Sequence, residues 1–392
     1  MKKLLIIIPS FSNGGTISSL INLLHYLNRE YYTIDILAIS AIGPNYSALS
    51  EYANVLNPPH TSNNSRKTGL RNTVVSIVKS IKKLLCRLGF DISPLVFSLD
   101  AKKWDKKRYD CVIGFQEGQA TLFASLFKTT KKLCWIHSDY ENMLRIASKE
   151  PEHLLYKRFN AIICVSSYTK NSFLKFIPEA AKKTFAIHNC LNTERIYTLS
   201  RKTDILPDFF SGAIKIVSVG RLDPVKRFHL IPSVQKTIKS LGLNTRWYIL
   251  GGGSDNEKQL IEKEIMRNCV GDSVFMMGNQ DNPYPFMANS DLVVCTSFSE
   301  ACPYVINEAK VLGVPIVSTD FSSVKEYINS GNNGIVSTVD QLATSIFELL
   351  TNKKLYMSIK NNLRDWSYDN GQIVKEIDSV LSHAIENDLL GK

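Results

Sequence analysis

The chain has 392 residues, 44% of them hydrophobic and 21% charged, and a formal net charge of +11. This composition is typical of a folded globular protein and excludes a disordered chain, and the length suits two domains better than a single core. A membrane-spanning helix is excluded as well, because no apolar run approaches the ~18 residues that such a helix needs.

The N-terminal half opens with a basic start and the apolar run Leu4–Ile8, which Pro9 follows. The run is too short for a signal peptide and has no small-residue cleavage site after it, so it predicts a buried strand. Short apolar runs then alternate with helical patterns, which is typical of doubly wound α/β sheets. The strands expected in this half are Leu4–Ile8, Ile34–Ile39, Cys111–Phe115, Leu133–Ile136, Ile162–Val165 and Thr184–Ile187.

A basic segment interrupts this half at residues 66–108. It holds twelve Lys and Arg residues against three acidic ones, so twelve minus three gives +9 of the total of +11. Within it, Leu70–Leu88 has the pattern of a basic amphipathic helix. We expect residues 66–108 to contact an anionic membrane surface, and an ordinary domain helix with a solvated face is the alternative. Nucleic acid is not expected as a partner, because no basic groove with interleaved aromatic residues is present.

The C-terminal half predicts a second set of strands, and each half has enough for one parallel sheet of five or six. These strands are Ile214–Val219, Arg246–Leu250, Val274–Met276, Leu292–Thr296 and Pro315–Ser318. We expect the domain boundary in Thr198–Ser211, around Pro207, with domains at 1–200 and 207–370. A C-terminal helix at about 371–392 is expected to pack back on the first domain. Ligands should bind at the carboxyl ends of the strands, in a cleft between the two domains.

Eight cysteines are spread over both halves, and none forms a C-x-x-C pair. Most lie in apolar strand-like runs, so we expect reduced core residues and no zinc site. No Asp-x-Asp metal motif occurs either, and the sequence indicates neither a metal ion nor a cofactor.

The segment Ser290–Asp320 gives the strongest indication of a ligand site. A predicted strand leads into a polar loop with Glu300, and Pro303 suits the first turn of a helix that Gly313 closes. The free amides at the start of this helix suit an anion, and the carboxylates of Glu300 and Glu308 suit sugar hydroxyls. The alternative is that both glutamates only favour the helix start or face solvent.

Two cations follow the strand Ile214–Val219. Arg221 and Lys226 lie five residues apart after Gly220, at the carboxyl end of that strand. Fixed cations in such a place neutralise the charge that develops on a diphosphate leaving group. We interpret Arg227, in contrast, as an ordinary solvated residue.

These motifs resemble those of the family-four retaining glycosyltransferases, whose GT-B fold has two Rossmann-like domains with parallel sheets facing across a cleft. The pair Glu300-x7-Glu308 and the run G-R-L-x-x-x-K from Gly220 to Lys226 carry the resemblance. Four further segments are similar to that family in the same order, so that the resemblance extends over nearly the whole chain: Ser10–Gly15, Trp135–His137, Cys164–Tyr168 and Ile187–Asn192.

The resemblance implies a role for each matched side chain. Arg221 and Lys226 would bind the donor diphosphate, and Glu308 would bind the ribose hydroxyls of the nucleotide. Glu300 would hold the transferred sugar, which His137 would face from the first domain. A structural histidine after an apolar strand is the alternative for His137.

Several positions would act mainly through their backbone. Gly14 and Gly15 would let the main chain approach the phosphates and the acceptor. The stretch Cys302, Pro303, Tyr304 and Val305 would bind the donor beside Glu300, and Gly278, Asn279 and Gln280 are the candidates for contacting the nucleotide base. Two positions depart from the family pattern: Ala301 stands where the family usually has Gly, and the triplet Gly251–Gly253 stands where the family has a looser turn.

The family resemblance also implies an activity. It indicates a retaining, metal-independent transfer of a hexose from a nucleotide-diphosphate sugar, with UDP favoured, to a glycan acceptor on a lipid diphosphate carrier. Such a reaction belongs to capsule, lipopolysaccharide or exopolysaccharide synthesis at the cytoplasmic face of the membrane. Two alternatives share the architecture: a nucleotide-sugar epimerase, and a non-catalytic protein that binds the nucleotide sugar.

Overall fold

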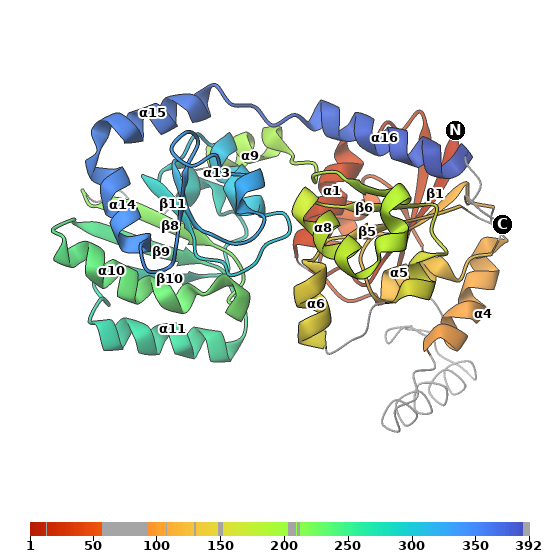
Figure 1. Ribbon diagram of the computed structural model, residues 1–392, viewed down its shortest axis with the longest axis horizontal. Coiled ribbons are helices and arrows are strands. Elements are labelled where there is room, and N and C mark those ends of the chain that lie inside the picture. The colour runs from red at the N-terminus through yellow and green to blue at the C-terminus, as the bar shows by residue number, and fades with distance from the viewer. Residues whose placement is uncertain are drawn as a thin grey trace. The chain divides into compact units, whose positions relative to one another are not determined.

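Figure 1 shows a computed structural model of the chain, which describes residues 1–12, 14–56, 93–106, 108–128, 131–147, 152–202, 209 and 212–386. The chain forms two compact units, one made of Met1–Leu191 with Asp369–Lys392 and one made of Asn192–Tyr368. The expected basic helix at Leu70–Leu88 lies outside the described residues. In the part that is described, no helix is both long and apolar enough to cross a membrane.

The first unit is built on a seven-stranded parallel sheet in the order β3-β2-β1-β4-β5-β6-β7. Its strands are β1 (Lys2–Ile8), β2 (Tyr32–Ala38), β3 (Asn54–Val55), β4 (Cys111–Gly114), β5 (Lys131–Ile136), β6 (Ala161–Cys164) and β7 (Thr184–Ala186). The central strand β1 pairs with β2 on one side and β4 on the other, so that Leu4 lies between Ile34 and Cys111. Parallel strands need crossover connections, and helices therefore cover the sheet.

The helices of this unit are α1 (Gly15–Tyr26), α2 (Tyr46–Ser50), α4 (Ser93–Asp105), α5 (Gln119–Ser125), α6 (Tyr140–Ala147), α7 (His153–Tyr156), α8 (Ser167–Phe176), the 3-10 helix η1 (Pro178–Lys183) and α16 (Asn370–Glu386). Residues from α4 to α8, such as Phe97, Phe123 and Phe173, share a core with one side of the strands. The helix α16 packs against α1, β5 and β6. Its first residue, Asn370, bonds through Oδ1 to the Leu191 amide at 2.9 Å and through Nδ2 to Tyr26 Oη at 3.0 Å.

The second unit contains a six-stranded parallel sheet in the order β10-β9-β8-β11-β12-β13. Its strands are β8 (Ile214–Val219), β9 (Thr245–Leu250), β10 (Val274–Gly278), β11 (Leu292–Cys295), β12 (Ile316–Thr319) and β13 (Ile335–Ser337). Successive side chains of β9 enter different cores, with Trp247 and Ile249 on one face and Tyr248 on the other. This period of two shows that the sheet is buried on both sides.

The helices of the second unit are α9 (Thr193–Ser200), α10 (Ile231–Ser240), α11 (Asp255–Asn268), α12 (Tyr284–Ala288), α13 (Tyr304–Val311), α14 (Leu342–Thr351) and α15 (Lys353–Arg364), with short 3-10 helices η3 (Pro224–Lys226), η4 (Phe228–Leu230) and η5 (Val324–Glu326). Residues of α10, α11 and α14 share one core, and residues of α12 and α13 share the other. Both sheets therefore have the doubly wound architecture of a Rossmann-like domain.

The boundary between the units differs from the expected one. Residues 193–200 fall in the first expected domain, 1–200, but in the structure they form α9, which belongs to the second unit beginning at Asn192. The physical reason is packing, because α9 lies against α12 and α13. The chain returns to the first unit at Asp369, close to the expected 371.

All eleven expected strands are present, with ends that differ by at most two residues. The sequence missed β3 and β13, which are only two and three residues long and lie at sheet edges. Seven cysteines are described and none of these is in a disulfide: five are buried and Cys302 is partly buried, but Cys269 is exposed, contrary to the expectation of a core role.

Candidate functional site

The residues singled out in the second unit gather where the strand order of its sheet reverses. The chain runs outward from β8 through β9 to β10 and then returns to β11 on the other side of β8. The loops that leave β8 and β11 therefore diverge, and ligands of doubly wound sheets bind in the crevice that forms at this point. Arg221 and Lys226 follow β8, and Glu300 follows β11.

The loop after β8 is held by close backbone contacts. Gly251 has a φ of +153°, and a Cβ there would lie 1.8 Å from the Gly220 carbonyl oxygen, so only glycine fits. Leu222 then bridges to Gly253, and Asp223 caps the helix η3 by accepting the Val225 amide at 3.0 Å. The Gly triplet thus fixes where the turn with the two cations leaves the sheet.

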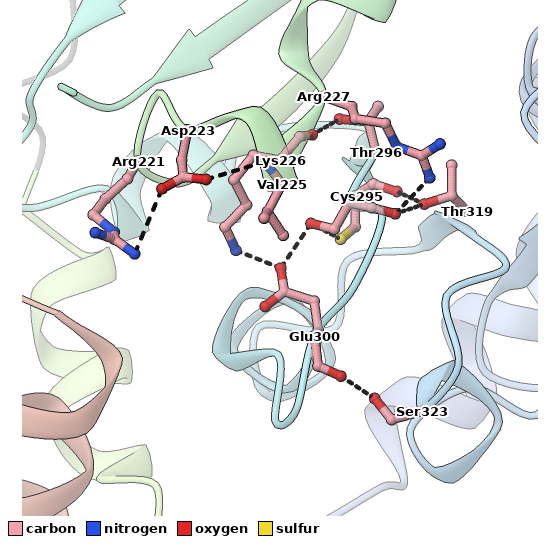
Figure 2. Close-up of polar contacts among 11 residues, drawn as sticks. Arg221, Asp223, Val225, Lys226, Arg227, Cys295, Thr296, Glu300, Thr319 and Ser323 are labelled. Atoms are coloured by element: carbon pink, nitrogen blue, oxygen red, sulfur yellow. Dashed lines mark hydrogen bonds and ion pairs between the residues drawn. The ribbon is translucent and has the colours of Figure 1, made fainter. Parts of the chain in front are cut away.

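Lys226 and Glu300 form an ion pair between the two loops (Figure 2). The ammonium donates a hydrogen bond to Glu300 Oε1, which also accepts the Ser297 hydroxyl at 2.7 Å. The two paired side chains are 21% and 14% exposed. No protein partner is found for Glu300 Oε2 among the described residues, so this oxygen can accept a hydroxyl of a ligand.

Further hydrogen bonds fasten the two loops to each other. Thr296 Oγ1 donates to the Lys226 carbonyl at 2.6 Å, and the Phe298 amide donates to the Val225 carbonyl at 2.7 Å. The Glu300 carbonyl accepts the Ser323 hydroxyl at 2.6 Å (Figure 2). The ion pair is therefore supported by backbone contacts on both sides, which fixes its geometry before any ligand arrives.

Lys226 stays protonated at neutral pH. Burial disfavours its ammonium, but the attraction of Glu300 and smaller contributions outweigh burial, and the pKa of Lys226 lies above its ordinary value. Arg221 is less constrained than Lys226: its side chain is 72% exposed, and Asp223 is its one partner among the described residues, with 4.0 Å between Nη2 and Oδ2 (Figure 2). The two cations leave the same turn, one anchored and one able to swing toward an anion.

Arg227 is not the solvated residue that the sequence suggested. It adopts a left-handed backbone with a φ of +51°, which is unusual for a residue with a Cβ. Its Nη2 donates to the Ser297 carbonyl at 3.1 Å, and its guanidinium lies 5.1 Å from the centre of the Phe298 ring. It therefore fastens the loop that carries Glu300. Local sequence offered no signal for this contact, which joins residues 70 positions apart.

The helix α13 is formed as the sequence indicated, with small differences at its start. Pro303 precedes the helix as its N-cap rather than lying in the first turn, and Gly313 follows it with a φ of +69°. The Val305 side chain is 8% exposed and packs in the core, so only its backbone can face a ligand. Ala301 stands where the family usually has glycine. Its φ is not positive, so its backbone conformation tolerates the extra methyl group.

Glu308 lies on α13 and is partly buried. Its Oε1 accepts the Tyr284 hydroxyl at 3.0 Å. Burial raises the pKa of Glu308 to about 7, although the hydrogen bond from Tyr284 and the charge of Lys226 oppose the rise. Tyr284 was not singled out from the sequence, because nothing in its own segment indicates where its hydroxyl points.

The residues considered for the nucleotide base lie at the end of β10. Gly278 has a φ of +67° and its carbonyl accepts the Gly251 amide at 2.8 Å. A Cβ at Gly252 would lie 3.4 Å from the Asn279 side chain, and Gln280 Nε2 donates to the Met277 carbonyl at 2.6 Å. This segment therefore adjoins the Gly triplet on the same edge of the sheet as the cations.

The first unit holds His137 at the end of β5. Its ring lies 5.0 Å from the Phe115 ring, and its Nε2 is buried with no partner among the described residues. Burial lowers the pKa of His137 to about 3, so the ring is neutral. Buried polar atoms without a partner are rare, and each needs an explanation such as a functional role.

A buried acid also lies in this unit, and nothing in its own segment of the sequence indicated it. Glu117 follows β4 and is 8% exposed. Its Oε2 accepts the His137 amide at 2.8 Å, and its Oε1 accepts the Ser138 hydroxyl. Gly14 and Gly15 follow β1, and a Cβ at either would meet nothing within 4 Å, so packing does not demand glycine there. These residues share the strand-order reversal of the first sheet, between β1 and β4.

In the second unit the structure thus brings Lys226 and Arg221, in the loop after β8, together with Glu300, in the loop after β11. Glu308 lies on the helix that follows Glu300, close enough for its carboxylate to feel the charge of Lys226, and the base candidates lie at the end of β10. His137, Gly14 and Gly15 lie in the first unit. No group of three or more His, Cys, Asp or Glu side chains is placed to hold a metal ion in the described parts of the chain.

Comparisons with known proteins agree with this arrangement. Residues 207–366 match the family described as Glycosyl transferases group 1. The chain spans about half the length of the first curated relatives that it matches, among them an uncharacterized glycosyltransferase MJ1059 of Methanocaldococcus jannaschii, 26% identical over 216 residues and 51% of each chain. A Campylobacter jejuni relative, named as an N-acetylgalactosamine-N,N'-diacetylbacillosaminyl-diphospho-undecaprenol 4-alpha-N-acetylgalactosaminyltransferase, is 24% identical over 72% of this chain and 73% of its own.

Solved structures extend the likeness to the whole fold. The structure of Anabaena Alr3699/HepE in complex with UDP and glucose superimposes with a TM-score of 0.74, at 18% identity, over 97% of this chain and all of that one. Together with the family match, this confirms the resemblance that the motifs indicated and the GT-B fold.

Proposed function

We propose that this chain, whose second unit is a glycosyl transferases group 1 domain and whose fold is GT-B, transfers a sugar from a nucleotide-diphosphate donor to a glycan acceptor. The observation that carries the proposal is the Lys226–Glu300 pair at the reversal of the sheet. The pair combines a protonated ammonium with a carboxylate oxygen that has no protein partner among the described residues, and both side chains follow strands at the reversal, where doubly wound sheets bind nucleotides.

Each group matches a part of such a donor. The ammonium of Lys226 and the exposed guanidinium of Arg221 suit the diphosphate, and the amides at the start of α13 add fixed donors. Glu300 Oε2 suits a sugar hydroxyl, and Glu308 suits the hydroxyls of the ribose. The segment Gly278–Gln280 then suits the base, because it lies on the same edge of the sheet.

We further propose that the transfer is retaining and needs no metal ion. The bond between the anomeric carbon and the phosphate oxygen breaks, the sugar gains positive charge, and the diphosphate gains negative charge. Lys226 and Arg221 stabilise that leaving group, as positioned cations do in a site with little water. The leaving oxygen then accepts the proton of the acceptor hydroxyl, which attacks the same face. No side-chain nucleophile is required.

Donor and acceptor are proposed from the relatives and from charge. The HepE structure contains UDP and glucose, which favours a UDP-hexose donor. The Campylobacter relative is named for an acceptor on diphospho-undecaprenol, and residues 66–108 carry most of the net charge of this chain. We therefore propose a lipid-linked glycan acceptor in cell-surface polysaccharide synthesis, reached from an anionic membrane surface. The sugar contact expected for His137 stays a prediction.

The test is product analysis with purified full-length protein. UDP-glucose, UDP-galactose, UDP-GlcNAc and GDP-mannose are each incubated with and without a lipid-diphosphate glycan acceptor. Transfer appears as a longer glycan and free nucleoside diphosphate, whereas an isomerised sugar without acceptor identifies an epimerase. Binding without any product identifies a non-catalytic protein.

Matched variants connect the activity to the site. Lys226→Met should abolish turnover nearly completely. Lys239→Met removes a cation of the same unit that pairs with Asp272 at 2.7 Å on the surface, and it should leave turnover unchanged. Equal activity in the two variants would contradict the proposed role of the site.

A further inference from the structure

The carboxylate of Glu308 is oriented by a neighbour from another helix. Tyr284, the first residue of α12, donates its hydroxyl to Glu308 Oε1 at 3.0 Å. No protein partner is found for Glu308 Oε2 among the described residues. One oxygen is thus fastened to the protein, and the other keeps both of its lone pairs for a ligand.

Tyr284 itself is held in place from several directions. Asn282 Oδ1 accepts the Tyr284 amide at 3.4 Å, while Asn282 Nδ2 donates to the Leu199 carbonyl of α9 at 2.9 Å. The following residues Phe286 and Met287 are buried in the core that α12 shares with α13. The hydroxyl is therefore presented to Glu308 by a packed element and not by a free loop.

We infer that Tyr284 is a positioning residue for donor binding: its hydroxyl holds Glu308 Oε1 so that Oε2 and the remaining lone pair of Oε1 accept the two ribose hydroxyls of the nucleotide. This inference rests on the proposed function and adds a residue to the same site. Recognition of two adjacent hydroxyls requires an acceptor with a fixed direction, and a carboxylate free to rotate would lose part of that precision.

The charges around Glu308 make the role of Tyr284 measurable. The groups that act on the Glu308 carboxylate are Tyr284 from α12 and Lys226 from η3, and Arg195 of α9 acts on Tyr284. Burial raises the pKa of Glu308 to about 7, and the hydrogen bond from Tyr284 is the first influence that opposes it. A protonated carboxyl group has lost an acceptor to its own O–H, so ribose binding needs the ionised form.

The experiment measures equilibrium binding of UDP-glucose, ADP-glucose and GDP-mannose by calorimetry from pH 5.5 to 8.5, because the phosphodiester groups of these donors do not titrate in that range. With full-length wild-type protein, affinity for the accepted donor should fall as pH falls through 7. In Tyr284→Phe the midpoint of this affinity change should rise by about one pH unit, because the ionised Glu308 loses a hydrogen bond. At pH 7 the ionised fraction then drops from about a half to about a tenth, which weakens binding about five-fold.

Two controls isolate this effect. Tyr356→Phe removes a tyrosine hydroxyl of the same unit that donates to the Asp291 carbonyl at 2.8 Å, and its profile should coincide with that of the wild type. Glu308→Gln should bind weakly without a pH step, and adding Tyr284→Phe to it should change nothing further. This second background keeps the test valid even if either single variant loses some stability.

The outcomes separate the two claims. If the wild type binds a donor but Tyr284→Phe has the wild-type pH profile, the role of Tyr284 is refuted while the proposed function stands. If Tyr284→Phe weakens binding equally in the Glu308→Gln background, the hydroxyl acts by another route and the inference is also refuted. If the wild type binds none of the three donors, the proposed function fails first.

Discussion

The ion pair of Lys226 and Glu300 allows a quantitative test of the site by a double-mutant cycle. Lys226→Met and Glu300→Gln each remove one charge at nearly constant volume. A fully buried pair costs 3–5 kcal/mol to break and an exposed pair contributes about 0–1 kcal/mol. Because the two side chains are 21% and 14% exposed, we expect each single variant to lose about 2 kcal/mol of unfolding free energy.

The double variant should lose less unfolding free energy than the sum of the two single variants. Each single variant leaves one buried charge without its partner, whereas the double variant leaves none. We expect a coupling energy of about 1–2 kcal/mol. For a unit of this size, a loss of about 2 kcal/mol lowers the melting temperature by roughly 4–8 °C. Scanning calorimetry of the full-length protein without ligand measures these shifts, and the exposed pair Lys239–Asp272 supplies a matched cycle with coupling near zero.

Activity gives the second half of the test. Lys226→Met removes a cation from the leaving diphosphate and should lower kcat/KM by about 10²–10³-fold, as the loss of one charge-stabilising group does in other enzymes. Glu300→Gln should also lower kcat/KM, because the freed ammonium and the lost acceptor both change the site. Strictly additive melting shifts would show that the two side chains do not interact in solution, and normal turnover of Lys226→Met would refute its role at the diphosphate.

Three further predictions concern other parts of the chain. Gly251→Ala should destabilise the second unit and abolish donor binding, since the new Cβ would lie 1.8 Å from the Gly220 carbonyl oxygen, whereas Gly252→Ala should resemble the wild type in melting and binding. The pKa of His137 is about 3 in the folded protein and near 6.5 in the unfolded chain, so unfolding takes up a proton between these values and stability falls as pH falls below 6.5. His137→Gln should reduce this loss of stability at acid pH, measured by urea unfolding at several pH values, and an unchanged pH dependence would contradict the burial of the ring. Burial lowers the pKa of Lys310 to about 8 from 10.5, so stability should rise between pH 8 and 10.5, and Lys310→Met should flatten this rise.

Much of the fold could be predicted because its signals are local. Apolar runs such as Leu292–Cys295, in which every residue is buried, form strands covered on both faces, and such strands stand out from amphipathic helices by period and length. Gly313 marked the end of α13 for a similar reason, since a left-handed residue after a helix is usually glycine. The motif pairs Arg221 with Lys226 and Glu300 with Glu308 were also visible, because each pair lies within a few residues.

Other features depended on neighbours that are distant in sequence. The short edge strands β3 and β13 exist only because a longer strand pairs with them, and α9 joined the second unit because it packs on α12 and α13. The left-handed Arg227 gained its role from the Ser297 carbonyl. Composition and periodicity contain no information on such pairings.

By itself, the sequence determined that two parallel α/β units would form and which segments would end at the carboxyl edges of their strands. Tertiary structure alone decided which of those ends meet. Strands β9 and β10 separate β8 from β11 along the chain, yet β8 and β11 are neighbours in the sheet, and this order brings Lys226 to Glu300 across 74 residues. The hydroxyl of Tyr284 reached Glu308 for the same reason: a hydrogen bond depends on the direction of two side chains in space, which strand order and helix packing set together.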